Sequence, residues 1–180
     1  LSSFGLGANE NLQIDRVEIH PSTGTPRLVV FDPQKIDSSR ESLGAESTLD
    51  FFSRHGSMFG IKNPKQELRV TANFTDRLGH RHTTLAQTYR GVPVLGGLLR
   101  LHEGPAGRVR SVNGLFIPGI DLDPTPTVPS VIARSAAFTI IADEISVFDL
   151  PWLEAKAPTL MVLRMNLARG VPGRNHLVWE

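Results

Sequence analysis

The sequence of 180 residues contains no cysteine, which excludes a disulfide scaffold, a thiol nucleophile and a cysteine-bound zinc site. An excess of one charge is also missing, because 19 Lys and Arg balance 18 Asp and Glu and leave a formal net charge of +1. A basic surface for nucleic acid is therefore not expected. No apolar run reaches the roughly 18 residues that span a bilayer, so we also expect no membrane partner.

A complete catalytic motif is missing as well. His102-Glu103 begins like the zinc-protease motif HExxH, which needs two histidines one helical turn apart to bind a single metal ion. Here Ala106 occupies the position of the second histidine, and Gly104-Pro105 would break the helix that must carry it. No serine lies in a G-x-S-x-G turn. We therefore interpret His102-Glu103 as the exposed end of a strand.

A second group of candidate ligands lies near a predicted turn. His80 and His82 are two residues apart, so on a strand they face the same side, and Asp76 lies across the adjacent turn. Two histidines and one carboxylate on a turn do not make a preorganised metal site. We interpret the group as a solvated hairpin tip, and we predict no catalytic, cofactor-binding or metal-ligating residue in this chain.

The N-terminal part of the chain is predicted to form a helix packed on an antiparallel meander. Ile14 to His20 and Arg27 to Phe31 are rich in Val and Ile and flank a turn-forming segment, which indicates a hairpin. Residues 46–59 show the helical spacing of apolar residues, with Gly60 as the stop. Residues 67–76 alternate and indicate a half-buried strand. The side chains predicted to share its buried face are Leu68, Val70, Ala72 and Phe74.

Three further strands are predicted to complete this sheet. After the strand from Arg81 to Arg90, the glycines between Gly91 and Gly97 indicate a bend. Leu98 to His102 and Arg108 to Pro118 follow as strands, and Asn113-Gly114 indicates a turn or bulge in the second of them.

Gln87 and Tyr89 lie two residues apart and therefore share one face of their strand. A buried Gln87 amide would need partners for its hydrogen bonds, and these bonds would lock the geometry of the sheet. We interpret these two residues and the neighbouring glycines as structural, because they specify a shaped surface rather than a reaction.

A proline-rich stretch, Asp121 to Pro129, marks the boundary to a second unit. Residues 130–143 show helical spacing, and the apolar runs Thr159 to Met165 and His176 to Trp179 indicate a hairpin. We expect this small helix-plus-hairpin unit to be truncated at its C-terminus. The predicted fold class is α+β, with domains at residues 1–120 and 121–180.

The run from Gln87 to Gly97, together with Gly107 to Gly114, resembles the fungalysin/thermolysin propeptide domain. Residues 124–180 resemble the PepSY domain that follows it in thermolysin-type precursors, with His176 to Glu180 as its last strand. The resemblance implies two small cystatin-like units, each with a helix on an antiparallel sheet. The family signature, which is also the predicted protease contact, comprises Gln87, Tyr89, Gly91, Val92, Pro93, Val94, Gly96, Gly97, Asn113, Gly114 and Trp179.

The resemblance also implies a function, namely the propeptide of a secreted, thermolysin-like zinc metalloendopeptidase. Such a propeptide acts as an intramolecular chaperone and an inhibitor of its cognate catalytic domain, which is then the expected partner. Zinc, together with calcium, belongs to that catalytic domain, so no cofactor is expected in this chain and the chain itself is not expected to be an enzyme. The alternative is a free-standing PepSY-type protease inhibitor or binding module.

Overall fold

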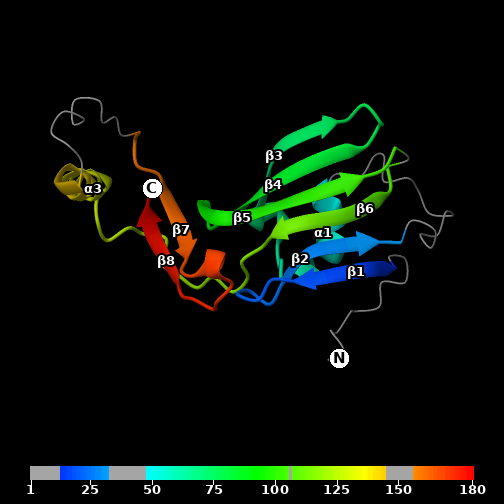
Figure 1. The fold of residues 1–180 in the computed structure, drawn as a ribbon, viewed down its shortest axis with the longest axis horizontal. Coiled ribbons are helices and arrows are strands. Elements are labelled where there is room, and N and C mark those ends of the chain that lie inside the picture. The colour runs from blue at the N-terminus through cyan, green and yellow to red at the C-terminus, as the bar shows by residue number, and fades with distance from the viewer. Residues whose placement is uncertain (1–12, 33–47, 106, 145–155) are drawn as a thin grey trace.

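The computed structural model describes residues 13–32, 48–105, 107–144 and 156–180, and Figure 1 shows its α+β fold, which confirms the predicted class. One antiparallel sheet has the strand order β1-β2-β6-β5-β4-β3, and a hairpin of β7 and β8 attaches to β5. The strands are β1 (Ile14–Ile19), β2 (Pro26–Phe31), β3 (Leu68–Thr75), β4 (Arg81–Tyr89), β5 (Val92–Glu103), β6 (Val109–Leu115), β7 (Leu160–Arg164) and β8 (Asn175–Trp179). The helices are α1 (Thr48–His55), α2 (Pro64–Glu67) and α3 (Ser130–Glu144), with 3-10 turns η2 (Gly56–Phe59) and η4 (Leu167–Arg169).

The predicted N-terminal hairpin is confirmed. β1 pairs antiparallel with β2, and the backbone N–H of His20 closes the loop by donating to the Thr25 carbonyl at 2.9 Å. β2 then pairs with β6, so the hairpin lies at one edge of the sheet. Val29 and Phe31 of β2 are buried, and the hairpin therefore contributes to the main core.

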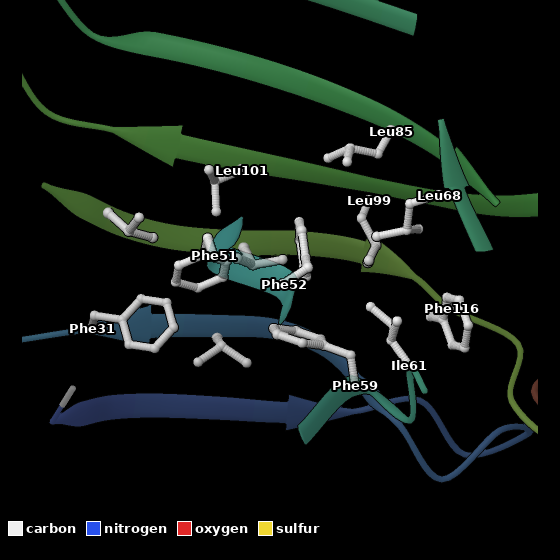
Figure 2. Close-up of a cluster of buried hydrophobic side chains, with 13 residues drawn as sticks. Phe31, Phe51, Phe52, Phe59, Ile61, Leu68, Leu85, Leu99, Leu101 and Phe116 are labelled. Carbon is white, nitrogen blue, oxygen red and sulfur yellow. The ribbon is translucent and has the colours of Figure 1, made fainter. Parts of the chain in front are cut away.

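The predicted helix over residues 46–59 is confirmed for its described part. α1 continues directly into η2, and the segment ends at Gly60, whose φ of 81° lies in the left-handed region. Phe51 and Phe52 of α1 are buried with their ring centroids 5.2 Å apart, edge to face. Figure 2 shows these rings between the helix and the sheet. The main core consists of Val29, Phe31, Phe51, Phe52, Phe59, Ile61, Leu68, Leu85, Leu99, Leu101, Val109, Val112 and Phe116.

β3 departs from the predicted alternation. A bulge between Val70 and Ala72 inserts one extra residue opposite β4, which moves the residues after it to the other face of the sheet. Phe74 therefore pairs with His82 on the face away from the core, where it is 58% exposed. The prediction that Leu68, Val70, Ala72 and Phe74 share a buried face is wrong, and Leu68 alone among them is buried.

The C-terminal region has the predicted elements but buries little of their surface. β7 and β8 pair antiparallel as expected, and Val162 of β7 is fully buried. α3 forms where it was predicted, yet most of its described side chains are exposed, including Val131 at 65%. The indole N–H of Trp179 donates to the Val128 carbonyl at 2.8 Å and ties β8 to the proline-rich segment. The domain boundary at residue 120 stays a prediction.

Candidate functional site

The predicted bend over residues 91–97 is wrong, because a much shorter turn reverses the chain. Arg90 and Gly91 form this turn with φ of 48° and 84°, and Tyr89 pairs with Val92 across it. A two-residue turn with both residues at positive φ matches the twist of antiparallel strands, which explains why it is favoured here. The remaining residues of the predicted bend therefore belong to β5.

A wide bulge interrupts the start of β5. On β4 a single residue, Gln87, lies opposite residues 94–97 of β5. Gly96 has a φ of 77°, a conformation that favours glycine. Val94 leaves the main sheet at this point and pairs in parallel with Val162 of β7. β5 therefore joins the main sheet to the C-terminal hairpin.

The side chain of Gln87 lies where the bulge opens the sheet, and it is buried with 3% of its surface exposed. Its Nε2 donates to the Ile117 carbonyl at 2.7 Å, and its Oε1 accepts the Ile117 N–H at 2.8 Å. A Cβ at Gly97 would lie 2.7 Å from the Cβ of Gln87, so glycine is needed to admit this side chain. The prediction that a buried Gln87 amide has its hydrogen bonds satisfied is confirmed, and these bonds join β4 to the segment that follows β6.

Tyr89 holds the same connecting segment at a second point. Its hydroxyl donates to the Leu122 carbonyl at 3.0 Å and accepts the Leu122 N–H at 3.2 Å. The guanidinium carbon of Arg90 lies 5.3 Å from the centroid of the Tyr89 ring, within cation–π range. Gln87 and Tyr89 therefore make the same type of two-bond contact to two residues of the chain that leaves β6.

These contacts surround a second, smaller hydrophobic core. Val94, Ile117 and Val162 are buried in it, and they come from β5, from the segment after β6 and from β7. The partly buried side chains that pack against these three are Tyr89, Val92, Ile120, Leu122, Leu167 and Leu177. We refer to this small core, together with the Gln87 and Tyr89 contacts, as the joint. It links the two regions, because its residues come from both sides of the predicted boundary.

Asn113 and Gly114 do not form the predicted turn or bulge, because both lie in regular register within β6. A Cβ at Gly114 would lie 2.1 Å from the Leu98 carbonyl oxygen, and the φ at this glycine is 122°. The close approach of the neighbouring strand therefore requires glycine here. The Oδ1 atom of Asn113 lies 2.7 Å from Nε2 of His102.

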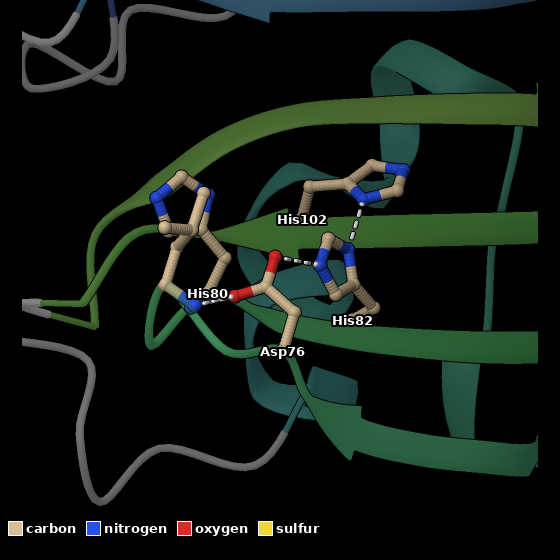
Figure 3. Close-up of polar contacts among 5 residues, drawn as sticks. Asp76, His80, His82 and His102 are labelled. Atoms are coloured by element: carbon tan, nitrogen blue, oxygen red, sulfur yellow. Dashed lines mark hydrogen bonds and ion pairs between the residues drawn. The ribbon is translucent and has the colours of Figure 1, made fainter.

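The Asn113–His102 contact is part of a network of polar side chains. This network lies on the face of the sheet opposite the main core. Nδ1 of His102 lies 2.7 Å from Nδ1 of His82, and Nε2 of His82 lies 3.1 Å from Oδ2 of Asp76, as Figure 3 shows. The backbone N–H of His80 donates to Asp76, and this bond, followed by the bond from His82, lowers the pKa of Asp76. The predicted hairpin tip is thus an ordered network. The sequence analysis did not place His102 beside His82, because only the strand register brings the two residues together.

Glu103 is buried, which corrects the prediction of an exposed strand end at His102-Glu103. Its carboxylate accepts two hydrogen bonds from the Arg81 guanidinium, at 2.6 Å from Nε and 2.5 Å from Nη2. The hydrogen bond to Glu103 is the largest cause that raises the pKa of Arg81. The alternation of Leu99, Leu101 and Glu103 carried the signal that this carboxylate points inward.

The predicted signature residues divide between the interior and the surface. Gln87, Val94 and Gly97 are buried in the joint, whereas Gly91 and Gly96 are exposed. Trp179 is partly exposed at the end of β8, Pro93 and Val92 are partly exposed at the start of β5, and Asn113 and Gly114 lie within β6. Their predicted contact with a protease stays a prediction.

Within residues 13–32, 48–105, 107–144 and 156–180, no group of three or more His, Cys, Asp or Glu side chains is arranged to hold a metal ion. None of the helices in these described ranges has the length and apolar character needed to cross a membrane. The polar contacts described above are therefore the chemistry that this structure offers for the proposals below.

Comparison with known proteins confirms the resemblance of the segments Gln87 to Gly97 and Gly107 to Gly114 to the propeptide family, whereas the resemblance of residues 124–180 to a PepSY domain stays a prediction. Residues 66–116 match the family described as Fungalysin/Thermolysin Propeptide Motif. The chain is 29% identical over 102 residues to the thermolysins of Alicyclobacillus acidocaldarius subsp. acidocaldarius and Bacillus caldolyticus, covering 55% of this chain and 18% of each relative. The chain thus spans less than a fifth of the length of these relatives. The Bacillus megaterium YpeB C-terminal domain is similar at 13% identity and a TM-score of 0.36, covering 97% of this chain and 79% of that chain.

Proposed function

We propose, because residues 66–116 carry a fungalysin/thermolysin propeptide motif, that this chain is the propeptide of a secreted thermolysin-like zinc metalloendopeptidase. In this role it assists the folding of the catalytic domain and then inhibits it. The observation that carries the proposal is the motif match, which spans β3 to β6 and includes Gln87 and Tyr89 of the joint. The similarity to two thermolysins supports the same class of partner.

A preformed sheet is suited to this role. The N-terminal region has a hydrophobic core of its own. Most of its conformational entropy is therefore lost when it folds and not when it binds a partner. A catalytic domain with many non-local contacts folds over a high barrier, and a partner that binds its native-like arrangement lowers that barrier. The same complementary surface then stabilises the folded domain by mass action, which supports inhibition by the chain that assisted folding.

The surface that we propose for the catalytic domain is the β3 edge together with the tip of the β4–β5 hairpin. β3 is the last strand in the order of the main sheet, so in the described part of the chain its outer edge offers backbone groups to another strand. Val70 and Phe74 are exposed on β3, and Gly91 and Leu95 are exposed at the hairpin. The buried signature residues act in this proposal by shaping the surface, not by touching the partner.

The test is a titration of the purified chain into an active thermolysin-type protease, with peptide hydrolysis as the readout and mass spectrometry to follow the chain. We expect saturable inhibition by an intact chain. In a parallel experiment, the chain should raise the yield of active enzyme when a denatured catalytic domain is refolded. An intact chain that neither inhibits nor raises this yield would contradict the proposal and favour a free-standing binding module.

A pair of matched variants tests the proposed surface. Phe74→Glu introduces a charge on the β3 edge, and Ile132→Glu introduces the same charge at a similarly exposed apolar position of α3. We expect Phe74→Glu to weaken inhibition by roughly tenfold or more, as for the loss of an interface anchor, and Ile132→Glu to leave it unchanged. Equal effects of the two substitutions, or a loss confined to Ile132→Glu, would place the contact elsewhere.

A further inference from the structure

Two histidines face each other directly across β4 and β5. His82 and His102 are register partners, so their side chains leave the same face of the sheet at adjacent positions. Their Nδ1 atoms are 2.7 Å apart, and the rings meet at an interplanar angle of 72° with centroids 5.0 Å apart. Both side chains are half-buried and remain accessible from solvent. Figure 3 shows the pair with Asp76, which also contacts His82.

The outer nitrogen of each ring faces an oxygen acceptor. Nε2 of His82 lies 3.1 Å from the Asp76 carboxylate, and Nε2 of His102 lies 2.7 Å from Oδ1 of Asn113. A ring nitrogen that faces such an oxygen carries the hydrogen, because carboxylate and carbonyl oxygens only accept. A neutral imidazole has one N–H, so both Nδ1 atoms present lone pairs to each other. Two lone pairs at this separation repel unless a cation lies between them.

We propose that the two Nδ1 atoms bind a divalent transition-metal ion, with Cu²⁺ preferred. Nitrogen ligands lie about 2.0 Å from such an ion, so two ligands at a right angle are about 2.8 Å apart and two tetrahedral ligands about 3.3 Å apart. The observed 2.7 Å between Nδ1 of His82 and Nδ1 of His102 matches the right-angled arrangement. Square-planar or tetragonal coordination by nitrogen and oxygen is typical of Cu²⁺, which also binds such ligands more tightly than Zn²⁺.

The neighbouring groups orient both rings for this role. Metal-binding histidines almost always donate their second N–H to a carboxylate, a carbonyl or water, and both rings have such a partner here. Asp76 is itself held by the backbone N–H groups of Leu78 at 2.8 Å and His80 at 2.9 Å. Phe74 stacks on the His82 ring with centroids 4.9 Å apart. The pair thus supplies two oriented nitrogens, and water completes the coordination because the described residues offer no group of three ligands.

This site replaces the sequence-based interpretation of His80 and His82 as a solvated tip without metal ligands. The ring of His80 is not one of the proposed ligands, since its backbone N–H is what contacts Asp76. His102 takes its place, contributed by the neighbouring strand. The proposal is independent of the propeptide function, because it rests only on side chains of this chain.

The experiment is electron paramagnetic resonance of the purified chain titrated with copper sulfate, in buffer containing excess glycine to remove weakly bound ion. We expect one equivalent of bound Cu²⁺ with a tetragonal spectrum and coupling to two imidazole nitrogens. His82→Asn and His102→Asn should each abolish this species, while His80→Asn, the matched control on the same hairpin, should retain it. Thermal unfolding of each variant shows whether its fold is kept.

Two further measurements test the site, namely substitution of Asp76, which orients the His82 ring, and competition with Zn²⁺. Asp76→Asn should weaken copper affinity by about tenfold to a hundredfold and keep the two-nitrogen signature, since it alters the orienting partner and not a ligand. Zn²⁺ at equal concentration should displace little of the copper. The proposal is overturned if the His82→Asn and His102→Asn variants are folded and still give the copper spectrum with two imidazole nitrogens. It is also overturned if the unsubstituted protein retains no copper in the presence of glycine. In that case a proton alone lies between the Nδ1 atoms of His82 and His102.

Discussion

The two regions of this molecule use the same kinds of element, a helix and antiparallel strands, but they differ in what the helix does. In the N-terminal region α1 buries Phe51 and Phe52 against the sheet. In the C-terminal region α3 leaves Val131 and Ile132 exposed. An apolar helix is therefore not sufficient for a core. Its apolar residues must also fall on one face and meet a sheet wide enough to cover them.

The helix pattern and the size of the sheet both contribute to this difference. α1 is amphipathic, with polar residues around its buried aromatic pair, whereas α3 carries apolar residues around its whole circumference. The main sheet offers six strands, whereas β7 and β8 form a two-stranded hairpin, which has little surface of its own to bury. The C-terminal hairpin consequently depends on the joint, where Val162 packs against Val94 and Ile117.

The largest expected effect tests the contrast between the two helices. Phe52→Ala removes a fully buried ring, and we expect it to lower the free energy of unfolding by about 3–5 kcal/mol. Ile132→Ala on α3 should change it by less than about 0.5 kcal/mol, because that side chain is exposed. Urea denaturation followed by circular dichroism measures both values. Similar losses for the two variants would show that α3 is packed in solution.

A second prediction concerns the joint. Gln87→Leu leaves the buried N–H and carbonyl of Ile117 without their partners, and each such group costs about 1–3 kcal/mol. We expect the Ile117 amide to lose most of its protection against hydrogen exchange, while the Leu101 amide in the main sheet stays protected. Thr88→Val is the matched control on β4, since its hydroxyl bonds Gln66 at an exposed position. Uniform loss of protection throughout the sheet would mean that the joint and the main core unfold together.

A smaller effect is expected at the second contact of the joint. Tyr89→Phe keeps the ring and removes the hydroxyl that bonds both backbone groups of Leu122. Because Tyr89 is only partly buried, water can replace these bonds, and the expected loss is about 1 kcal/mol. Hydrogen exchange at the Leu122 amide is the measurement. Unchanged exchange at Leu122 would show that Gln87 alone holds the segment after β6.

The last prediction is a pH dependence that originates in the N-terminal region. Burial, followed by the charge of Arg54, lowers the pKa of His55 to about 4 in the folded chain, against about 6.5 when unfolded. The unfolded chain therefore binds the proton more readily below pH 6.5, and stability is lost as pH falls from about 6.5 towards 4. His55→Gln should flatten this slope, while His176→Gln at an exposed position of β8 should leave it intact. Denaturation midpoints at pH 7 and pH 5 give the slopes, and an unaltered slope in His55→Gln would contradict the assignment.

The sequence located most of the elements and predicted both hairpins, but it did not give the register of the strands or their bulges. A preceding turn placed β4 and an apolar run placed β8 to within a residue or two, and helical spacing with a terminal glycine placed α1 and η2. These signals are local, because each depends on the turn residues, the apolar composition or the 3.6-residue period of a single segment. The bulge after Val70 and the wide bulge opposite Gln87 were missed, since a bulge is a relation between two strands and has no period of its own.

The candidate site could be predicted only in part, again because local signals in the sequence do not show which distant residues meet. The order of glycines and polar residues between Gln87 and Gly97 indicated a shaped structural element, and the need of a buried amide for partners predicted that Gln87 is hydrogen-bonded. Nothing local identified Ile117 as that partner, because the two residues meet only when the chain returns after β6. The His82–His102 pair depends likewise on the register of β4 against β5.

By itself, then, the sequence determined the α+β class, the order of the strands and of the two longer helices α1 and α3, the lack of a disulfide framework and the propeptide motif. Only the tertiary structure decided that β5 pairs with strands of both the main sheet and the C-terminal hairpin. It also decided that Phe74 faces away from the core, that Glu103 is buried and that most described side chains of α3 are exposed. The physical reason is that propensity, periodicity and turn chemistry act between neighbours along the chain. Register, burial and the choice of hydrogen-bond partner are settled by residues that are distant in sequence and compete for the same space.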